Sequence, residues 1–218
     1  MNFNFDLIVD YAPLLWKGTL LTIGLSIASI LLGTIVGLFI ALGKMMRKKW
    51  LAFPFVVYIA FFRGTPLFVQ LLLIHFGVIP LFIGETNAIA AAIATLSLNS
   101  AAYIAEIFRG GIQSIEKGQM EGARSLGMSH VQAMRYVILP QALKRSIPPL
   151  GNEFIVLVKE SSLAAIITAP EIMYYSRNMS SAHFAVWEPY LTAALIYLVI
   201  TLTLSFILHR VEKRLDKS

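Results

Sequence analysis

The sequence predicts an all-α integral membrane protein with five transmembrane helices. Hydrophobic residues fill 57% of its 218 positions and charged residues only 14%, so the chain is too apolar to bury its surface as one water-soluble domain. The apolar residues fall into long stretches, each near the ~20 residues that a helix needs to cross ~30 Å of hydrocarbon. These stretches lie at about 14–42, 51–76, 88–108, 147–168 and 189–208. Residues 1–218 are therefore expected to form one transmembrane domain.

The basic residues predict the orientation of these spans. The net charge of +6 does not indicate nucleic acid, because the cations lie in short clusters beside the spans. With an outer N-terminus and a cytoplasmic C-terminus, 14 of the 18 basic residues are cytoplasmic, as the positive-inside rule expects. The 14 are Lys44, Arg47, Lys48, Lys49, Arg109, Lys117, Arg124, Arg135, Lys144, Arg145, Arg210, Lys213, Arg214 and Lys217.

The first span contains small residues at a spacing that favours close helix packing. Gly33 and Gly37 are four residues apart, and Ala41 follows after four more. Such a stripe lets a second helix approach closely. That helix belongs either to a second copy of the chain or to the same chain, and the sequence leaves both alternatives open.

The second span is interrupted by Arg63-Gly64-Thr65-Pro66. Proline removes a helical hydrogen bond, and irregular backbone at membrane depth is tolerated only inside protein or beside a water-filled cavity. Because broken helices often mark transport sites, Thr65 and Gln70 are candidate substrate ligands. A plain proline kink is the alternative.

The third span carries a polar stripe. Thr95, Asn99, Tyr103 and Glu106 recur at helical spacing, so this face is expected to point away from lipid. Asn99 and Ser97 are candidate substrate ligands, although Asn99 is equally suited to an interhelical hydrogen bond. Glu106 and Arg109 are expected to form a structural pair.

The fourth span is expected to begin behind Pro148 and Pro149 and carries Asn152 and Glu153. A carboxylate at the centre of a membrane helix costs about 2.5–3.5 kcal/mol, so it needs a partner. We expect Glu153 to face the translocation path, with Asn152 beside it, and to pair with a cationic group of the substrate. A salt bridge from Glu153 to Lys159 or Arg63 is the alternative.

Two further features of this span concern its outer end. Lys159 and Glu160 are expected to pair with each other or with nearby chains. Ser161 and Ser162 mark a weak point in the helix.

Residues 118–140 form the longest soluble segment and predict two short helices. The first runs from Gly118 to Gly127 and ends at a glycine suited to a left-handed terminus. Ser129 and Gln132 form a capping box for the second, which is expected to stop or bend at Pro140. The apolar face of the second helix consists of Val131, Met134, Val137 and Ile138.

This segment resembles the EAA loop, E-A-A-x3-G-x9-I-x-L-P, of permease subunits in binding-protein-dependent ABC importers. Glu121-Gly122-Ala123, Gly127 and Val137-Ile138-Leu139-Pro140 match its spacing, with Gly122 and Val137 as departures. The runs R-G-T-P-L-F-V-Q from Arg63 and A-A-Y-I-A-E-I-F-R-G-G-I from Ala101 resemble the polar amino acid branch.

The resemblance implies a MetI-like permease fold in a prokaryotic plasma (inner) membrane and import of polar amino acids, of the basic amino acid or glutamine type. The carboxylate of Glu153 favours a basic amino acid over glutamine, although it could also hold the ammonium group of any amino acid. It implies a second permease subunit, two ATPase subunits that bind ATP-Mg, and an extracytoplasmic amino acid-binding protein. The segment 118–140 would dock on an ATPase. The residues implied in that coupling are Glu121, Gly122, Ala123, Arg124, Leu126 and Gly127.

Other functional motifs are missing from the sequence. No G-x-x-x-x-G-K-[ST] loop occurs, so the chain is not expected to hydrolyse ATP. Cysteine is absent and the four histidines are far apart, so no metal site or other cofactor is expected. An ion-coupled secondary amino acid transporter is the main alternative, and a membrane-embedded enzyme is a third.

Overall fold

The computed structural model describes residues 3–46 and 48–215, and in these ranges it contains helices and no β-strand. The predicted all-α class is therefore confirmed. Two predicted cytoplasmic cations, Arg47 and Lys217, lie outside the described residues. In chain order the segments are α1 (Phe5–Lys44), α2 (Lys49–Gly64), α3 (Leu67–Leu72), the π-helix η1 (Leu73–Val78), α4 (Ile79–Ile83), α5 (Ala88–Gln113), α6 (Lys117–Ser125), α7 (His130–Ala133), the π-helix η2 (Met134–Ile138), α8 (Leu139–Glu160), the 3-10 helix η3 (Ser161–Ile167), α9 (Ile172–His183) and α10 (Trp187–Leu215).

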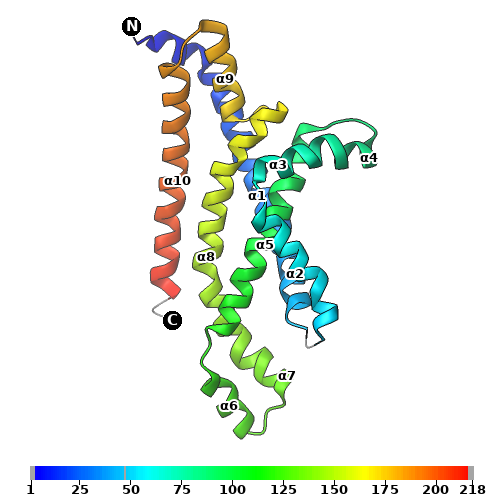
Figure 1. Cartoon of the computed structure of the whole chain (residues 1–218). Coiled ribbons are helices and arrows are strands. Elements are labelled where there is room, and N and C mark those ends of the chain that lie inside the picture. The colour runs from blue at the N-terminus through cyan, green and yellow to red at the C-terminus, as the bar shows by residue number, and fades with distance from the viewer. Residues whose placement is uncertain (1–2, 47, 216–218) are drawn as a thin grey trace.

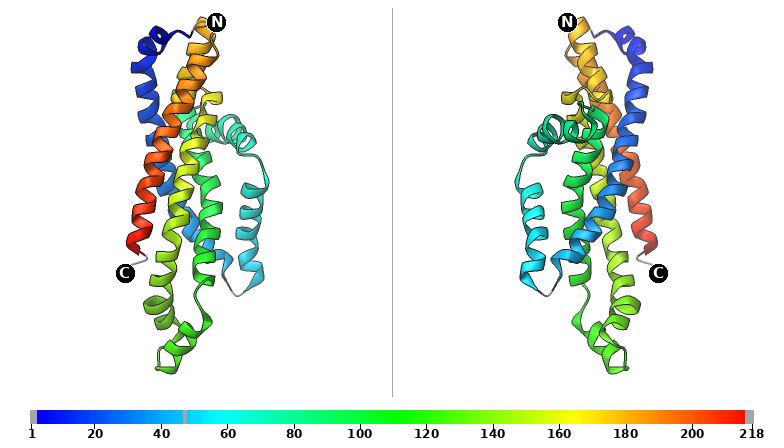
Figure 2. Two further views of the ribbon diagram at one scale, coloured as in Figure 1. Left: turned by 90° about the vertical axis from the view of Figure 1, so that its left-hand side faces the viewer. Right: turned by 90° about the vertical axis from the view of Figure 1, so that its right-hand side faces the viewer.

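The long helices run side by side along one axis (Figure 1). The most extensive contact joins α1 and α5, and α8 packs against α5, α10 and α1. The short helices α6 and α7 form one end of the molecule, whereas α9 and the N-terminus lie at the opposite end (Figure 2). The segment α3–η1–α4 instead leaves the bundle sideways.

Among the described helices, α1, α5 and α10 are each long and apolar enough to span a membrane alone. A fourth span is formed if α2 is joined to Leu67–Ile83, which is bent from it by 108°. This bend confirms the predicted interruption before Pro66. The predicted span 147–168 is not identified in this way, because α8 carries charged residues such as Arg145, Glu153 and Lys159. The number of five spans therefore stays a prediction.

Small residues on α1 allow α5 to pack closely within the same chain. A Cβ atom at Gly33 would overlap the Ser100 hydroxyl, and one at Gly37 would lie 2.9 Å from the Ala101 carbonyl oxygen. Ala41 is 2% exposed and lies in the core that these helices share. The stripe therefore serves packing inside this chain, which was one of the two alternatives.

Of the predicted stop or bend at Pro140, the stop is wrong, because the second helix of the segment 118–140 continues past this proline. Residues 130–160 are helical without interruption, through α7, η2 and α8. The π-helical turn Met134–Ile138 directly precedes Pro140 and changes the hydrogen-bond pattern where proline has no N–H to donate. The segment 118–140 is thereby continuous with the membrane bundle.

The predicted helix start at Pro148 and Pro149 is also wrong, because both lie inside α8. These prolines remove the donors that would reach the carbonyl groups of Lys144 and Arg145. Both of those residues lie on the exposed side of the helix. At its far end α8 changes into a 3-10 helix at Ser161, which confirms the predicted weak point.

A buried carboxylate that sequence reasoning missed joins three helices near α9. Glu171 is fully buried and accepts hydrogen bonds from the Tyr174 N–H (2.8 Å), the Tyr197 hydroxyl (2.5 Å) and the Thr22 hydroxyl (3.4 Å). The helix α1 reaches this point because Gly18 has no side chain: a Cβ there would lie 2.9 Å from the backbone of Glu171. Burial raises the pKa of the Glu171 carboxyl.

Candidate functional site

The break between α2 and α3 is closed by a network of polar side chains. The Gln70 amide donates to the Phe62 carbonyl (2.9 Å), the Thr65 carbonyl (3.0 Å) and the Thr65 hydroxyl (2.9 Å). From α5, the Asn99 amide donates to the Gln70 side-chain oxygen (2.9 Å) and to the Phe62 carbonyl (3.2 Å). Gln70 and Asn99 are 2% and 5% exposed. The structure thus brings together three of the six predicted substrate ligands.

The donors of this network point at the chain's own oxygen atoms. That arrangement matches the interhelical hydrogen bond that was the alternative for Asn99. Ser97 lies apart, on the side of α5 that faces α1, where its carbonyl oxygen would be 3.2 Å from a Cβ at Gly33. Its buried hydroxyl has no hydrogen-bond partner among the described residues. A substrate-binding role for Thr65, Gln70, Asn99 and Ser97 stays a prediction.

Two half-buried carboxylates lie on one face of α8. Glu153 and Glu160 are seven residues apart, which is two helical turns. Within residues 3–46 and 48–215 neither side chain forms a salt bridge or a hydrogen bond, so Lys159 and Glu160 are not joined by a salt bridge there, and their pairing with nearby chains stays a prediction. Glu160 lines a narrow space together with Leu67 of α3 and Thr95 of α5. We call Glu153 and Glu160 the acidic stripe.

The alternative partners for Glu153 are engaged elsewhere or too distant. Glu106 accepts from Lys44 (2.5 Å) and from Arg109 (2.7 Å), and Arg63 approaches the same carboxylate at 3.9 Å. The predicted Glu106–Arg109 pair is therefore confirmed. Because neither Arg63 nor Lys159 pairs with Glu153 in the described chain, the predicted alternative of an internal salt bridge is wrong. Asn152, next to Glu153, is exposed.

The helix α6 and the turn after it form the tip of the molecule (Figure 1). Gly127 has φ +86°, and its N–H and that of Met128 donate to the carbonyls of Arg124 (3.0 Å) and Ala123 (3.2 Å). This is the left-handed glycine terminus that the sequence predicts. No atom lies within 4 Å of a Cβ built at Gly122 or Gly127, so another surface can approach both positions.

The other predicted features of the tip are largely confirmed. Ser129 and Gln132 form the capping box. Of the predicted apolar face of the second helix, Met134, Val137 and Ile138 pack into a small core, whereas Val131 is 73% exposed. The exposed candidate coupling residues are Glu121, Gly122, Arg124, Leu126 and Gly127, whereas Ala123 is buried.

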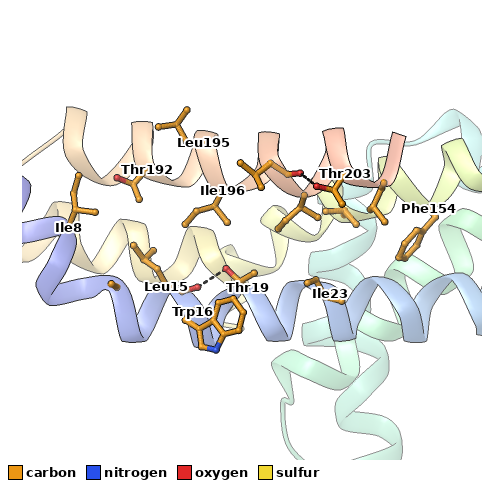
Figure 3. A pocket seen from close by; sticks show the side chains of 15 residues that line it. Ile8, Leu15, Trp16, Thr19, Ile23, Phe154, Thr192, Leu195, Ile196 and Thr203 are labelled. Carbon is orange, nitrogen blue, oxygen red and sulfur yellow. Dashed lines mark hydrogen bonds between the residues drawn. The ribbon is translucent and has the colours of Figure 1, made fainter. Parts of the chain in front are cut away.

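A large apolar groove in the described part of the chain does not suit an amino acid. It is a groove of about 660 Å³ between α1, α8 and α10, lined mainly by aliphatic side chains (Figure 3). The hydroxyls of Thr19 and Thr203 donate to carbonyls of their own helices, at 2.8 and 2.7 Å. No charged residue lines the groove. It therefore offers no charged partner for an ammonium or a carboxylate group.

The sequence analysis did not single out Glu160, because Lys159 beside it suggested an ion pair. Adjacent residues of a helix do not face each other, whereas residues seven apart do. The spacing from Glu153 to Glu160 was therefore the signal that pointed to the acidic stripe.

Comparisons with known proteins agree with this geometry. The family model described as binding-protein-dependent transport system inner membrane component matches residues 10–217. The probable amino-acid ABC transporter permease protein YckA of Bacillus subtilis (strain 168) is 44% identical over 195 residues, 89% of this chain and 86% of the relative. The glutamine transport system permease protein GlnP of Escherichia coli (strain K12) is 38% identical over 218 residues, 99% of both chains.

A solved structure is similar as well. It is a crystal structure of an amino acid ABC transporter with histidines, and a chain in it superposes with a TM-score of 0.93 at 44% identity. The match covers 98% of this chain and 100% of the other.

Proposed function

This chain belongs to the family of binding-protein-dependent transport system inner membrane components, and we propose that, as a permease subunit of an amino-acid ABC importer, it carries amino acids with cationic side chains past Glu153. It is a multi-pass membrane protein without its own ATPase site, so ATP hydrolysis belongs to a partner subunit. Membership of this family replaces the ion-coupled transporter and the membrane enzyme that the sequence alone left as alternatives.

The acidic stripe is the observation that supports a substrate with a cationic side chain. An unpaired carboxylate at membrane depth is costly, and a cationic substrate group compensates it while the substrate passes. Glu153 and Glu160 offer two such carboxylates in succession along one helix face. A neutral amino acid brings only its ammonium group, whereas arginine or lysine brings a second cation. Relatives do not decide this point, since one is named for glutamine and a solved transporter is described with histidines.

Amino acid uptake by the variant Glu153→Gln tests whether Glu153 binds the cationic group of the substrate. The variant is reconstituted in vesicles with its ATPase and binding protein, and uptake of arginine and of glutamine is compared with the wild type. We expect arginine uptake to fall at least tenfold and glutamine uptake to fall less. Asp6→Asn, an exposed carboxylate at the N-terminal end of α1, is the matched control. Undiminished arginine uptake by Glu153→Gln removes this residue from the pathway.

The tip of the molecule is the proposed docking surface for the ATPase. Leu126 is 84% exposed there, and Gly122 and Gly127 leave room for a second protein surface. We infer an assembly of two permease subunits, two ATPase subunits and an extracytoplasmic amino acid-binding protein. The tip is then cytoplasmic and the N-terminus is outside, which agrees with the excess of cations in the inner segments.

Co-purification tests the docking surface. An ATPase is expected to co-purify with the wild-type permease and to be lost with Leu126→Asp, because a charge replaces an exposed apolar contact. Val9→Asp, at a 70% exposed position near the opposite end, is the control. An ATPase retained equally by both variants contradicts docking at the tip.

A further inference from the structure

The segment Leu67–Ile83, made of α3, η1 and α4, forms an arm that leaves the bundle. It is bent by 108° from α2 and runs across the direction of the long helices (Figures 1 and 2). No Asp, Glu, Lys or Arg occurs between residues 67 and 84. Such a segment is unsuited to water, so its surroundings must be apolar.

Both faces of the arm are apolar. One face packs Leu71, Ile74 and Ile79 against α5 and η3. The only two polar side chains of the arm with hydrogen-bonding groups, Gln70 and His75, are also on the buried side, at 2% and 6% exposed. On the other side, Leu81 and Phe82 are each 82% exposed, and Phe76 is 64% exposed. A helix that is apolar all round is normally covered on all sides.

The charges beneath the arm indicate what covers it. Glu160 and Thr95 share a narrow space with Leu67 and Leu71 at the root of the arm. Glu153 lies two turns further along the same face of α8. Carboxylates without a partner face the interior of an assembly or a water-filled path and not lipid chains. The side of the bundle from which the arm starts is therefore expected to face protein.

We propose that the arm packs against the second permease subunit and covers the acidic stripe from the α9 end of the molecule. This inference rests on the pairing of two permease subunits proposed above. In a symmetric pair each arm lies on the other subunit, so the contact is made twice. The substrate path is then enclosed only when both subunits are present.

Photo-crosslinking in the assembled transporter tests whether the arm contacts the second permease subunit. A benzophenone amino acid replaces Phe82, whose side chain is 82% exposed and whose replacement disturbs little packing. Two differently tagged permease copies, or the two permease chains of a mixed pair, are purified with the ATPase. After irradiation in nanodiscs we expect a covalent product that contains two permease chains, at least tenfold above the unirradiated sample.

A benzophenone at Leu126, which is 84% exposed at the tip, is the matched control and is expected to capture the ATPase. If residue 126 captures the ATPase but residue 82 gives only lipid adducts, the arm faces lipid and the inference is overturned. The pairing itself stands in that case as long as both tagged permeases co-purify. If the two tags never co-purify, the pairing has failed, and the arm has no second permease to contact.

Discussion

Replacing Gln70 by leucine tests whether the network at the helix break is structural. The Gln70 side chain takes part in four hydrogen bonds, as donor to Phe62 and Thr65 and as acceptor from Asn99. Leucine has a similar size but makes none of them. The variant therefore leaves the half-buried carbonyl of Thr65 and the buried amide of Asn99 without this partner.

The expected loss follows from the number of bonds. Hydrogen bonds between membrane helices average about 0.6 kcal/mol each, so losing all four lowers the free energy of unfolding by about 2 kcal/mol. The exposed Gln113 accepts one hydrogen bond, from Arg109. Gln113→Leu is therefore the matched control, with an expected change within about 0.5 kcal/mol.

Unfolding by sodium dodecyl sulfate in mixed micelles measures the stability, and uptake in vesicles measures function. If the network is structural, Gln70→Leu loses stability, and the uptake that remains keeps the wild-type preference between arginine and glutamine. A variant that is as stable as the wild type but has lost uptake refutes this reasoning. Gln70 would then act on the substrate.

Two further changes probe the tip and the buried carboxylate. Gly127→Val forces a β-branched residue to φ +86°, at a cost of about 1–2 kcal/mol. We expect this variant to insert into the membrane and to sustain ATP hydrolysis normally, while uptake falls at least tenfold. Normal coupled uptake would count against docking at the tip. Burial raises the pKa of Glu171 above its ordinary 4.5, so the folded chain keeps a proton that the unfolded chain loses. Stability should therefore fall as the pH rises from 4.5 through the raised pKa, and thermal unfolding of Glu171→Gln should lack this fall; an unchanged pH profile would contradict it.

Local signals in the sequence predicted the local features of the fold. Pro66 cannot donate a helical hydrogen bond, and the helix does break beside it. Gly127 tolerates positive φ, and Ser129 with Gln132 satisfies the free N–H groups of a helix start. Each of these depends on a few neighbouring residues, so no knowledge of tertiary structure was needed.

Features that depend on distant contacts were not predictable in this way. Pro140 is typical of a helix end, but a π-helical turn directly precedes it and the helix continues. Glu171 lies in a loop by sequence, and its burial depends on Thr22 and Tyr197 from two other helices. Arg63 likewise approaches Glu106 of α5, a carboxylate that it shares with Lys44 of α1, and spacing along the chain does not reveal this contact.

The continuity of residues 130–160 bears on how ATP hydrolysis moves the substrate path. From His130 to Glu153 the uninterrupted helix spans about 35 Å at 1.5 Å per residue, so a displacement at the proposed docking tip reaches the acidic stripe along one backbone. The helix α1 is less free to follow, because Glu171 holds it near its middle, at Thr22, and the Lys44–Glu106 ion pair holds it at its C-terminal end. The helix contains a π-helical turn at Met134–Ile138, and a 3-10 helix follows its end at Ser161–Ile167. The backbone hydrogen-bond pattern changes at both places. We therefore expect α8 to tilt between these two turns against a fixed pair of α1 and α5, and so to carry Glu153 from one side of the path to the other.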